Sequence, residues 1–95
     1  MKYTNLGLYI DGEWLGTSSG GIQPVSNPAD DLTLGELPLA GVAELDRALD
    51  AASRGFALWR RTSAHDRYTL LRKVALLVRE RHQRMAELIT LDQGK

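Results

Sequence analysis

The chain has 95 residues, 43% of them hydrophobic, and its 12 basic side chains balance 12 acidic ones. That length allows one domain, and the hydrophobic fraction is too high for a disordered segment. With no cysteine and only two histidines, the chain excludes a disulfide framework, a thiolate nucleophile and a cysteine-containing metal site among its own residues. Because no apolar run has the length of a signal peptide or a membrane span, we expect a cytoplasmic protein with no membrane partner.

Residues 8–38 predict short antiparallel strands and not a complete sheet. The β-prone runs 8–10 and 13–15 flank Asp11-Gly12, which is a strong signal for a two-residue hairpin turn. Because a two-stranded hairpin is only marginally stable alone, we expect these strands to lean on helices or on further chain.

A second strand pair is expected from residues 22–25 and 32–38. Pro24 confines its strand to an edge or to irregular pairing, because proline has no amide proton for a ladder. The intervening Asn-Pro-Ala-Asp-Asp sequence has turn chemistry, since Pro28 holds the preceding residue extended and the aspartates favour a turn.

The next segment predicts an amphipathic helix over about 42–58. Its stripe has apolar residues at spacings of three and four, namely Val42, Leu45, Leu49, Ala52 and Phe56. Ala48, Ala51 and Ala52 keep one side slim, which allows another element to approach closely. On the side expected to face solvent, the Asp50–Arg54 pair adds about 0.3 kcal/mol.

The last third of the chain predicts two more helices, over about 64–81 and 84–93. Ser63 is the expected N-cap of the first, and Gly94 the expected C-cap of the second. We expect a break near His82, because a run of six polar residues interrupts the apolar stripe there.

Two apolar residues predict contacts beyond these stripes. Trp59 follows the first helix, and its large apolar area makes it the expected plug between that helix and the next. Leu76 lies on the side of its helix opposite to the stripe, which indicates a second packing partner. Together with the helix cap so near Lys95, these features predict a segment of a larger protein.

The charge is unevenly distributed along the chain. Residues 60–84 hold eight basic and two acidic side chains, whereas residues 1–59 hold three basic and eight acidic ones. A basic helix is one mark of a nucleic-acid binder. We favour a solvated helix face instead, because no aromatic residues interleave with the arginines as a single-strand platform requires.

The sequence contains no convincing catalytic triad or phosphate-binding loop. Ser63, His65 and Asp66 are close in sequence, but a catalytic triad is normally assembled from separate elements, and Ser63 is better used as a cap. His82 is interpreted as a helix-surface residue. The glycine-rich loop 16–21 is interpreted as a flexible turn, because no Gly-Lys-Ser/Thr or helix follows it as a phosphate cradle requires.

Six local patterns in order resemble the opening of the NAD(P)-dependent aldehyde dehydrogenase superfamily. The first three are I-x-G-x-W at Ile10, Gly12 and Trp14, the N-P-A turn at Asn27, Pro28 and Ala29, and G-x-x-P at Gly35 and Pro38. The helical patterns that follow are Asp46, Ala48, Ala51-Ala52, Phe56 and Trp59-Arg60, then Arg67, Leu71, Ala86 and Leu88. The chain closes with Asp92-Gln93-Gly94-Lys95, which is most similar to the succinate-semialdehyde dehydrogenase branch.

The resemblance implies an enzyme that oxidises an aldehyde to a carboxylic acid with NAD or NADP through a cysteine thioester. It implies an α/β subunit with a Rossmann-like cofactor domain, in which residues 1–95 are the N-terminal part of that domain. The catalytic and oligomerisation domains would then lie outside this chain. The implied partners are the rest of the subunit, a small aldehyde and further copies in a homo-oligomer.

No residue here matches the family's cysteine, glutamate, oxyanion-hole asparagine or nucleotide-binding positions. We therefore assign no catalytic, cofactor-binding or metal residue within 1–95, and we expect this segment alone to be inactive. Two other hypotheses stay open: a stand-alone binding or assembly module with this architecture, and a nucleic-acid binder that uses residues 60–84. The aldehyde and the choice between NAD and NADP depend on residues absent from the chain.

Overall fold

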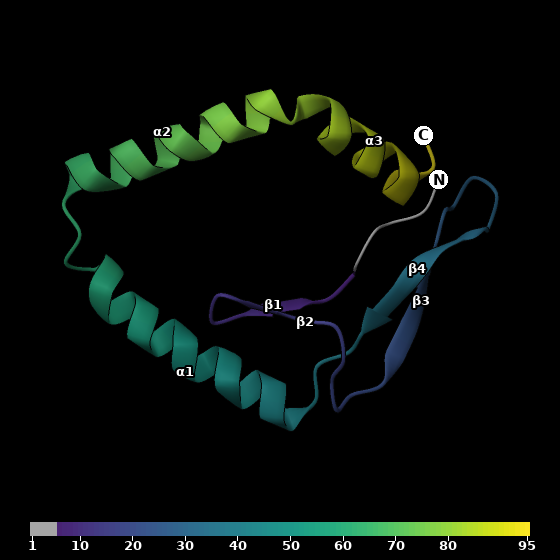
Figure 1. Cartoon of the computed structure of the whole chain (residues 1–95), viewed down its shortest axis with the longest axis horizontal. Helices are drawn as coiled ribbons and strands as arrows, with labels where there is room; N and C mark the ends of the chain where they lie inside the picture. Colours follow the sequence, from purple (N-terminus) through teal and green to yellow (C-terminus); the bar gives the residue numbers. More distant parts are fainter. Residues whose placement is uncertain (1–5) are drawn as a thin grey trace.

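The computed structural model describes residues 6–95 as two strand pairs followed by three helices (Figure 1). The elements are β1 (Leu8–Ile10), β2 (Glu13–Leu15), β3 (Ile22–Ser26), β4 (Thr33–Pro38), α1 (Val42–Trp59), α2 (Ala64–Glu80) and α3 (His82–Gln93). The predicted strands and helices are confirmed. The break between the last two helices falls at Arg81, whose φ of −102° and ψ of 13° are not helical.

The first hairpin joins β1 and β2 through the predicted turn. Asp11 and Gly12 adopt φ values of 53° and 77°, which the two-residue turn requires at both central positions. Side chains alternate across the hairpin, so Tyr9 and Trp14 pair on one face, with ring centroids 4.9 Å apart. Glu13 belongs to the opposite face, which is directed at α1.

The second hairpin pairs β3 with β4, from Ile22 opposite Pro38 to Ser26 opposite Thr33. Its turn is held by short side chains, as expected from their sequence. Asn27 Oδ1 accepts a hydrogen bond from the Ala29 amide at 2.9 Å, and Asp30 Oδ1 accepts one from the Leu32 amide at 3.0 Å.

Helix α1 has one face that contacts the first hairpin and an opposite face that is apolar and exposed. On one face, Arg47 and Arg54 reach back to the first hairpin, and the half-buried Ala48 and Ala51 lie between them at helical spacing. Two of the three alanines predicted to form a slim side thus lie where α1 approaches β1, whereas Ala52 is exposed with the apolar stripe. The apolar stripe lies on the opposite face of α1 and is largely exposed: Val42, Leu45, Leu49 and Phe56 are 75%, 53%, 69% and 64% accessible.

Both predicted caps in the second half are present. Ser63 Oγ accepts a hydrogen bond from the Asp66 amide at 3.1 Å and so begins α2. Gly94 ends α3 in the left-handed conformation with φ 73°. It meets the turn of the second hairpin, where a Cβ at position 94 would lie 2.9 Å from the Ala29 amide nitrogen and 3.2 Å from the Pro28 Cβ.

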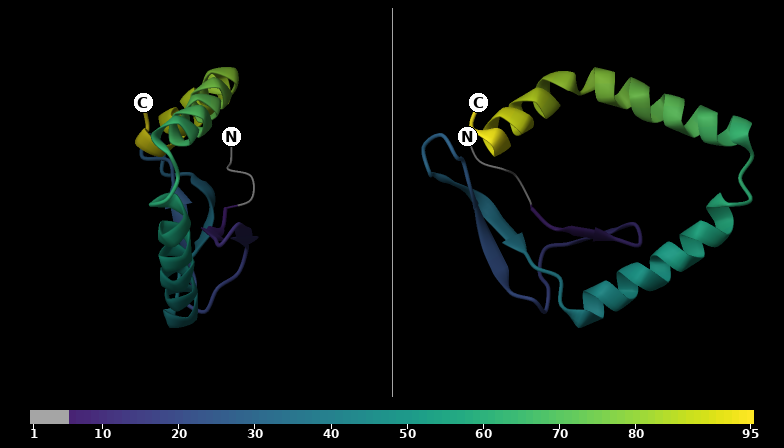
Figure 2. Two further views of the ribbon diagram at one scale, coloured as in Figure 1. Left: turned by 90° about the vertical axis from the view of Figure 1, so that its left-hand side faces the viewer. Right: turned by 180° about the vertical axis from the view of Figure 1, so that it is seen from behind.

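The elements follow one another around a flat, open frame (Figure 2). The frame measures 47 × 35 × 16 Å, and its radius of gyration is 16.7 Å. A compact chain of this length has about 12–13 Å. Within residues 6–95 only Leu34 and Pro38, both in β4, are buried. No helix in that range is long and apolar enough to cross a membrane.

Replacing Gly94 should weaken the contact that closes the frame. We expect Gly94→Ala to lower the free energy of unfolding by about 1–2 kcal/mol, because an L side chain at this φ is strained and its Cβ crowds Ala29. Urea denaturation measures the difference. The matched control is Gly55→Ala, since Gly55 lies inside α1 with open space around it, and this change should stabilise by about 0.5–1 kcal/mol. Equal stability of Gly94→Ala and the wild type would contradict the contact.

Candidate functional site

The acidic group most strongly perturbed by its surroundings is the carboxylate of Glu44, in the first turn of α1. It accepts hydrogen bonds from the Ser19 amide and hydroxyl, both at 2.6 Å, and from the Gly41 amide at 3.1 Å. The Ser19 hydroxyl is the largest cause of a pKa lowered from 4.5 to about 2, followed by the Ser19 amide. Because a general acid needs a pKa near the working pH, Glu44 is a structural anchor and not a proton donor.

The loop 16–21 is therefore tied to α1, although its composition predicted a flexible turn. Besides the Ser19 bonds to Glu44, the Ser18 hydroxyl and the Gly20 amide both donate to the Leu39 carbonyl. A Cβ at Gly41 would overlap the Ser19 hydroxyl. The N-terminus of α1 thus receives its negative charge from Glu44, which fills the place that a phosphate cradle would leave for a ligand.

A second polar cluster joins the first hairpin to α1. Arg47 donates to Glu13 at 2.9 Å, and Arg54 donates to Asp11 at 2.9 Å and to Asp50 at 3.0 Å. The hydrogen bond from Arg54 and its positive charge lower the pKa of Asp11. All of these side chains are paired with one another, so the cluster holds the first hairpin and α1 together.

The histidines stay apart from any nucleophile. Ser63 Oγ is used in the helix cap, and no hydrogen bond within residues 6–95 joins it to His65. The His65 ring lies 6.2 Å from the Tyr68 ring, and His82 Nδ1 lies 2.9 Å from the Arg79 carbonyl oxygen. Between residues 6 and 95, no three His, Cys, Asp or Glu side chains come together as metal ligands would.

The basic stretch 60–84 is largely engaged with its own helices. Five of its eight basic side chains make local contacts, on the Phe56 ring, the Ala57 carbonyl, Trp59, the Tyr68 hydroxyl and Glu87. These contacts favour the interpretation of a solvated helix face over a nucleic-acid surface.

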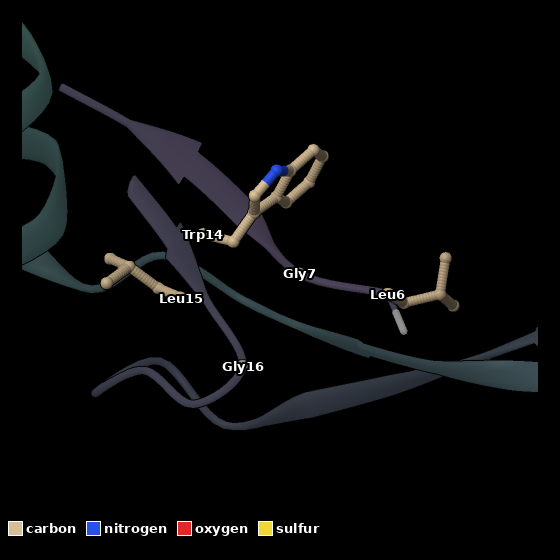
Figure 3. Close-up of a pocket in the computed structure, with 5 residues that line it drawn as sticks. All are labelled: Leu6, Gly7, Trp14, Leu15 and Gly16. Carbon is tan, nitrogen blue, oxygen red and sulfur yellow. The ribbon is translucent and has the colours of Figure 1, made fainter. Parts of the chain in front are cut away.

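Two surface hollows lie in the part of the chain that the structure describes. One lies beside the first hairpin, where the Trp14 ring stands close to Gly7 and the Leu15 side chain points away from it (Figure 3). The other lies on α3 between Glu87 and Leu91. Apolar side chains and backbone line the first hollow, so it has no polar groups converging on a substrate.

The largest unusual feature is the exposed apolar surface of the helices. The chain exposes 7587 Å², whereas a compact protein of 10.5 kDa exposes about 5,400 Å². The uncovered side chains of α2 include Leu70, Leu71, Val74, Leu77 and Val78, each at least 43% accessible. We call this set, with the α1 stripe, the apolar helix face. Soluble proteins rarely expose this many large apolar side chains, and large exposed apolar patches are typical of interaction sites.

The predicted plug, Trp59, lies at the corner between α1 and α2 but is not buried there. It is 40% exposed, and the guanidinium carbon of Arg67 lies over its ring, 5.1 Å from the ring centroid. Arg67 also donates to the Trp59 carbonyl at 2.5 Å and to the Thr62 carbonyl at 3.0 Å. Sequence reasoning missed this clamp, and its signal is an arginine within an apolar stripe.

Comparisons with known proteins show which family this chain resembles. The aldehyde dehydrogenase family model matches residues 14–95. An NADP(+) succinate-semialdehyde dehydrogenase of Escherichia coli strain K12 is 42% identical over all of this chain and 21% of its own length. The 3-sulfolactaldehyde dehydrogenase and a glutarate-semialdehyde dehydrogenase of Pseudomonas putida are 40% and 39% identical, each over 92% of this chain and 18% of their own length. The chain thus spans about a fifth of these relatives.

The Glu44 anchor has a pH signature. We expect the Glu44 carboxyl to titrate near 2 by NMR, and to move toward its ordinary 4.5 in Ser19→Ala, which removes the hydroxyl donor. Because its folded pKa is lowered, Glu44 stabilises the fold above pH 4.5, and that contribution is lost as the pH falls toward 2. Thr17→Ala, in the same loop, is the control and should leave the titration unchanged. An unshifted midpoint in Ser19→Ala would refute the anchor.

The exposed apolar helix face should be detectable in the isolated 95-residue chain. We expect this chain to bind a hydrophobic dye or to self-associate, because its helix stripes have no covering surface. Dye fluorescence and analytical ultracentrifugation measure both effects. A monomer that binds no dye and unfolds in one sharp, reversible transition would show that the face is covered.

Proposed function

The chain belongs to the aldehyde dehydrogenase family, and we propose that residues 1–95 form the N-terminal part of the cofactor-binding domain of a longer NAD(P)-dependent enzyme. The enzyme oxidises an aldehyde to a carboxylic acid through a cysteine thioester. The family match over residues 14–95 carries this proposal, and the exposed apolar helix face supports it. Such a face is what a domain segment shows when the rest of its domain is removed.

The reacting groups lie outside this segment. The chain has no cysteine, so the nucleophile comes from a later part of the polypeptide, as do the glutamate and asparagine that the family uses. We also place the nicotinamide dinucleotide site outside this segment. In support of this, Glu44 occupies the N-terminus of α1 and Asp66 lies in the first turn of α2, so these two helix ends already carry negative charge where a pyrophosphate would bind.

The contribution of residues 6–95 is therefore structural. The first hairpin and the Glu44 anchor hold one side of α1 and direct its stripe outward, where the stripe continues through Trp59 toward α2. In this proposal the apolar helix face packs against the remainder of the cofactor-binding domain. The catalytic and oligomerisation domains belong to the same longer subunit, which works in the cytoplasm as a homo-oligomer.

The proposed substrate is a semialdehyde, with succinate semialdehyde as the first choice. Two of the relatives named above are succinate- and glutarate-semialdehyde dehydrogenases, and the former is 42% identical over this segment. An aldehyde that carries a second, acidic group is the chemistry these names share. NAD and NADP are both candidates for the cofactor.

The test begins with the intact mass of the polypeptide as its source makes it. We expect a mass several times 10.5 kDa and NAD(P)-dependent oxidation of succinate semialdehyde, followed by the absorbance of the reduced nicotinamide. The 95-residue chain alone should show no turnover, because it lacks the nucleophile. A mass matching 95 residues would overturn the proposal in favour of a stand-alone assembly module.

A further inference from the structure

The corner between α1 and α2 places a charged group within the apolar helix face. Trp59 continues the stripe of α1, since it follows Phe56 by three residues. Arg67 shares its side of α2 with Leu71 and Val74, at spacings of four and seven residues. A guanidinium at the centre of a contact face must be paired there, because burying an unpaired charge is strongly unfavourable.

Within residues 6–95 Arg67 is only partly paired. Nε donates to the Thr62 carbonyl at 3.0 Å, and Nη2 donates to the Trp59 carbonyl at 2.5 Å. The guanidinium carbon lies over the Trp59 ring, 5.1 Å from its centroid. A guanidinium has five N–H donors in a fixed fork. In this part of the chain no carboxylate pairs with Arg67 and no acceptor meets Nη1.

We infer that the surface which covers the α1–α2 corner presents a carboxylate to Arg67 within an otherwise apolar contact. This inference rests on the proposed function, because it takes the covering surface from the part of the subunit beyond this chain. The two carbonyls and the indole fix the guanidinium before the covering surface arrives. Its open edge is then ready for the charge-assisted hydrogen bonds that arginine forms with a carboxylate.

The apolar side chains around Arg67 favour a carboxylate as its partner. The surrounding side chains are apolar, so water would be displaced and the positive charge would lose its solvation without a partner. The relatives are about five times as long as this chain, which leaves ample polypeptide of the same subunit to supply the surface. A backbone carbonyl alone would satisfy one donor but would leave the charge uncompensated.

The test removes the positive charge in the complete polypeptide. We expect Arg67→Met to raise the unfolding equilibrium constant about 10²–10³-fold near pH 8, because the carboxylate is left buried and unpaired. Such a carboxylate has a raised pKa and takes up a proton as the pH falls. The ratio of the unfolding constants of variant and wild type should therefore shrink at least about tenfold by pH 5. Urea unfolding followed by circular dichroism measures both constants.

A matched variant separates the effect of the positive charge of Arg67 from the effect of its side-chain geometry. Arg67→Lys keeps the positive charge but loses the fork and the contact with the Trp59 ring, so its ratio to the wild type should be the same at both pH values. α1 and the turn before α2 present to Arg67 only the Trp59 ring and two carbonyls, while Asp66 and His65 are its titratable neighbours on α2. Because histidine titrates in this range, the series is repeated with His65→Gln.

A ratio for Arg67→Met that is independent of pH would overturn the inference. If Arg67→Met does not fold near pH 8, Arg67→Gln, which keeps an amide donor for the Thr62 carbonyl, replaces it in the same series. The readout is separate from that of the proposed function. If the polypeptide is a longer, active dehydrogenase and the ratio is independent of pH, the inferred carboxylate is rejected and the proposed function is kept. If the protein is inactive and the ratio depends on pH, the proposed function is rejected and the carboxylate is kept.

Discussion

The carboxylate of Glu44 determines how the rest of the structure is arranged. It holds the loop between the two hairpins through Ser19 and caps α1 through Gly41, so one side chain joins segments 25 residues apart. The backbone pairing of Gly20 and Gly21 with Leu39 then places the second hairpin beside the same point. Because this junction sets the direction of α1, it also sets which face of α1 meets the first hairpin and which face stays open.

The features of the fold that could be predicted from the sequence are mostly set by short stretches of neighbouring residues. The Asp11-Gly12 turn, the Ser63 cap and the Gly94 end are each specified by a few neighbouring residues, and all three are present. The break near His82 follows from a local loss of apolar periodicity. Helix propensity, turn geometry and capping act over three or four residues, so they can be seen in one sequence without knowledge of the tertiary structure.

What sequence reasoning missed depends on residues far apart in the chain. Half of a capping box is visible as Glu44 three residues after Gly41, but nothing local shows that Ser19, 25 residues before Glu44, donates two hydrogen bonds to the same carboxylate. The Arg67 clamp on Trp59 crosses a helix boundary. The stripe of α1 is clear in the sequence, yet the pattern alone cannot say that residues 6–95 leave this stripe exposed while the alanine side meets β1.

The contact of Gly94 with the Pro28-Ala29 turn closes a loop of more than 60 residues through a small touching surface. The chain between the two sides of this contact is mostly helix and strand, and the touching surface is small compared with the length of chain that it closes. The end of α3 can therefore separate from the hairpin while the helices and strands keep their local structure. A surface that packs on the helices would therefore also affect how often the contact between Gly94 and the Pro28-Ala29 turn opens.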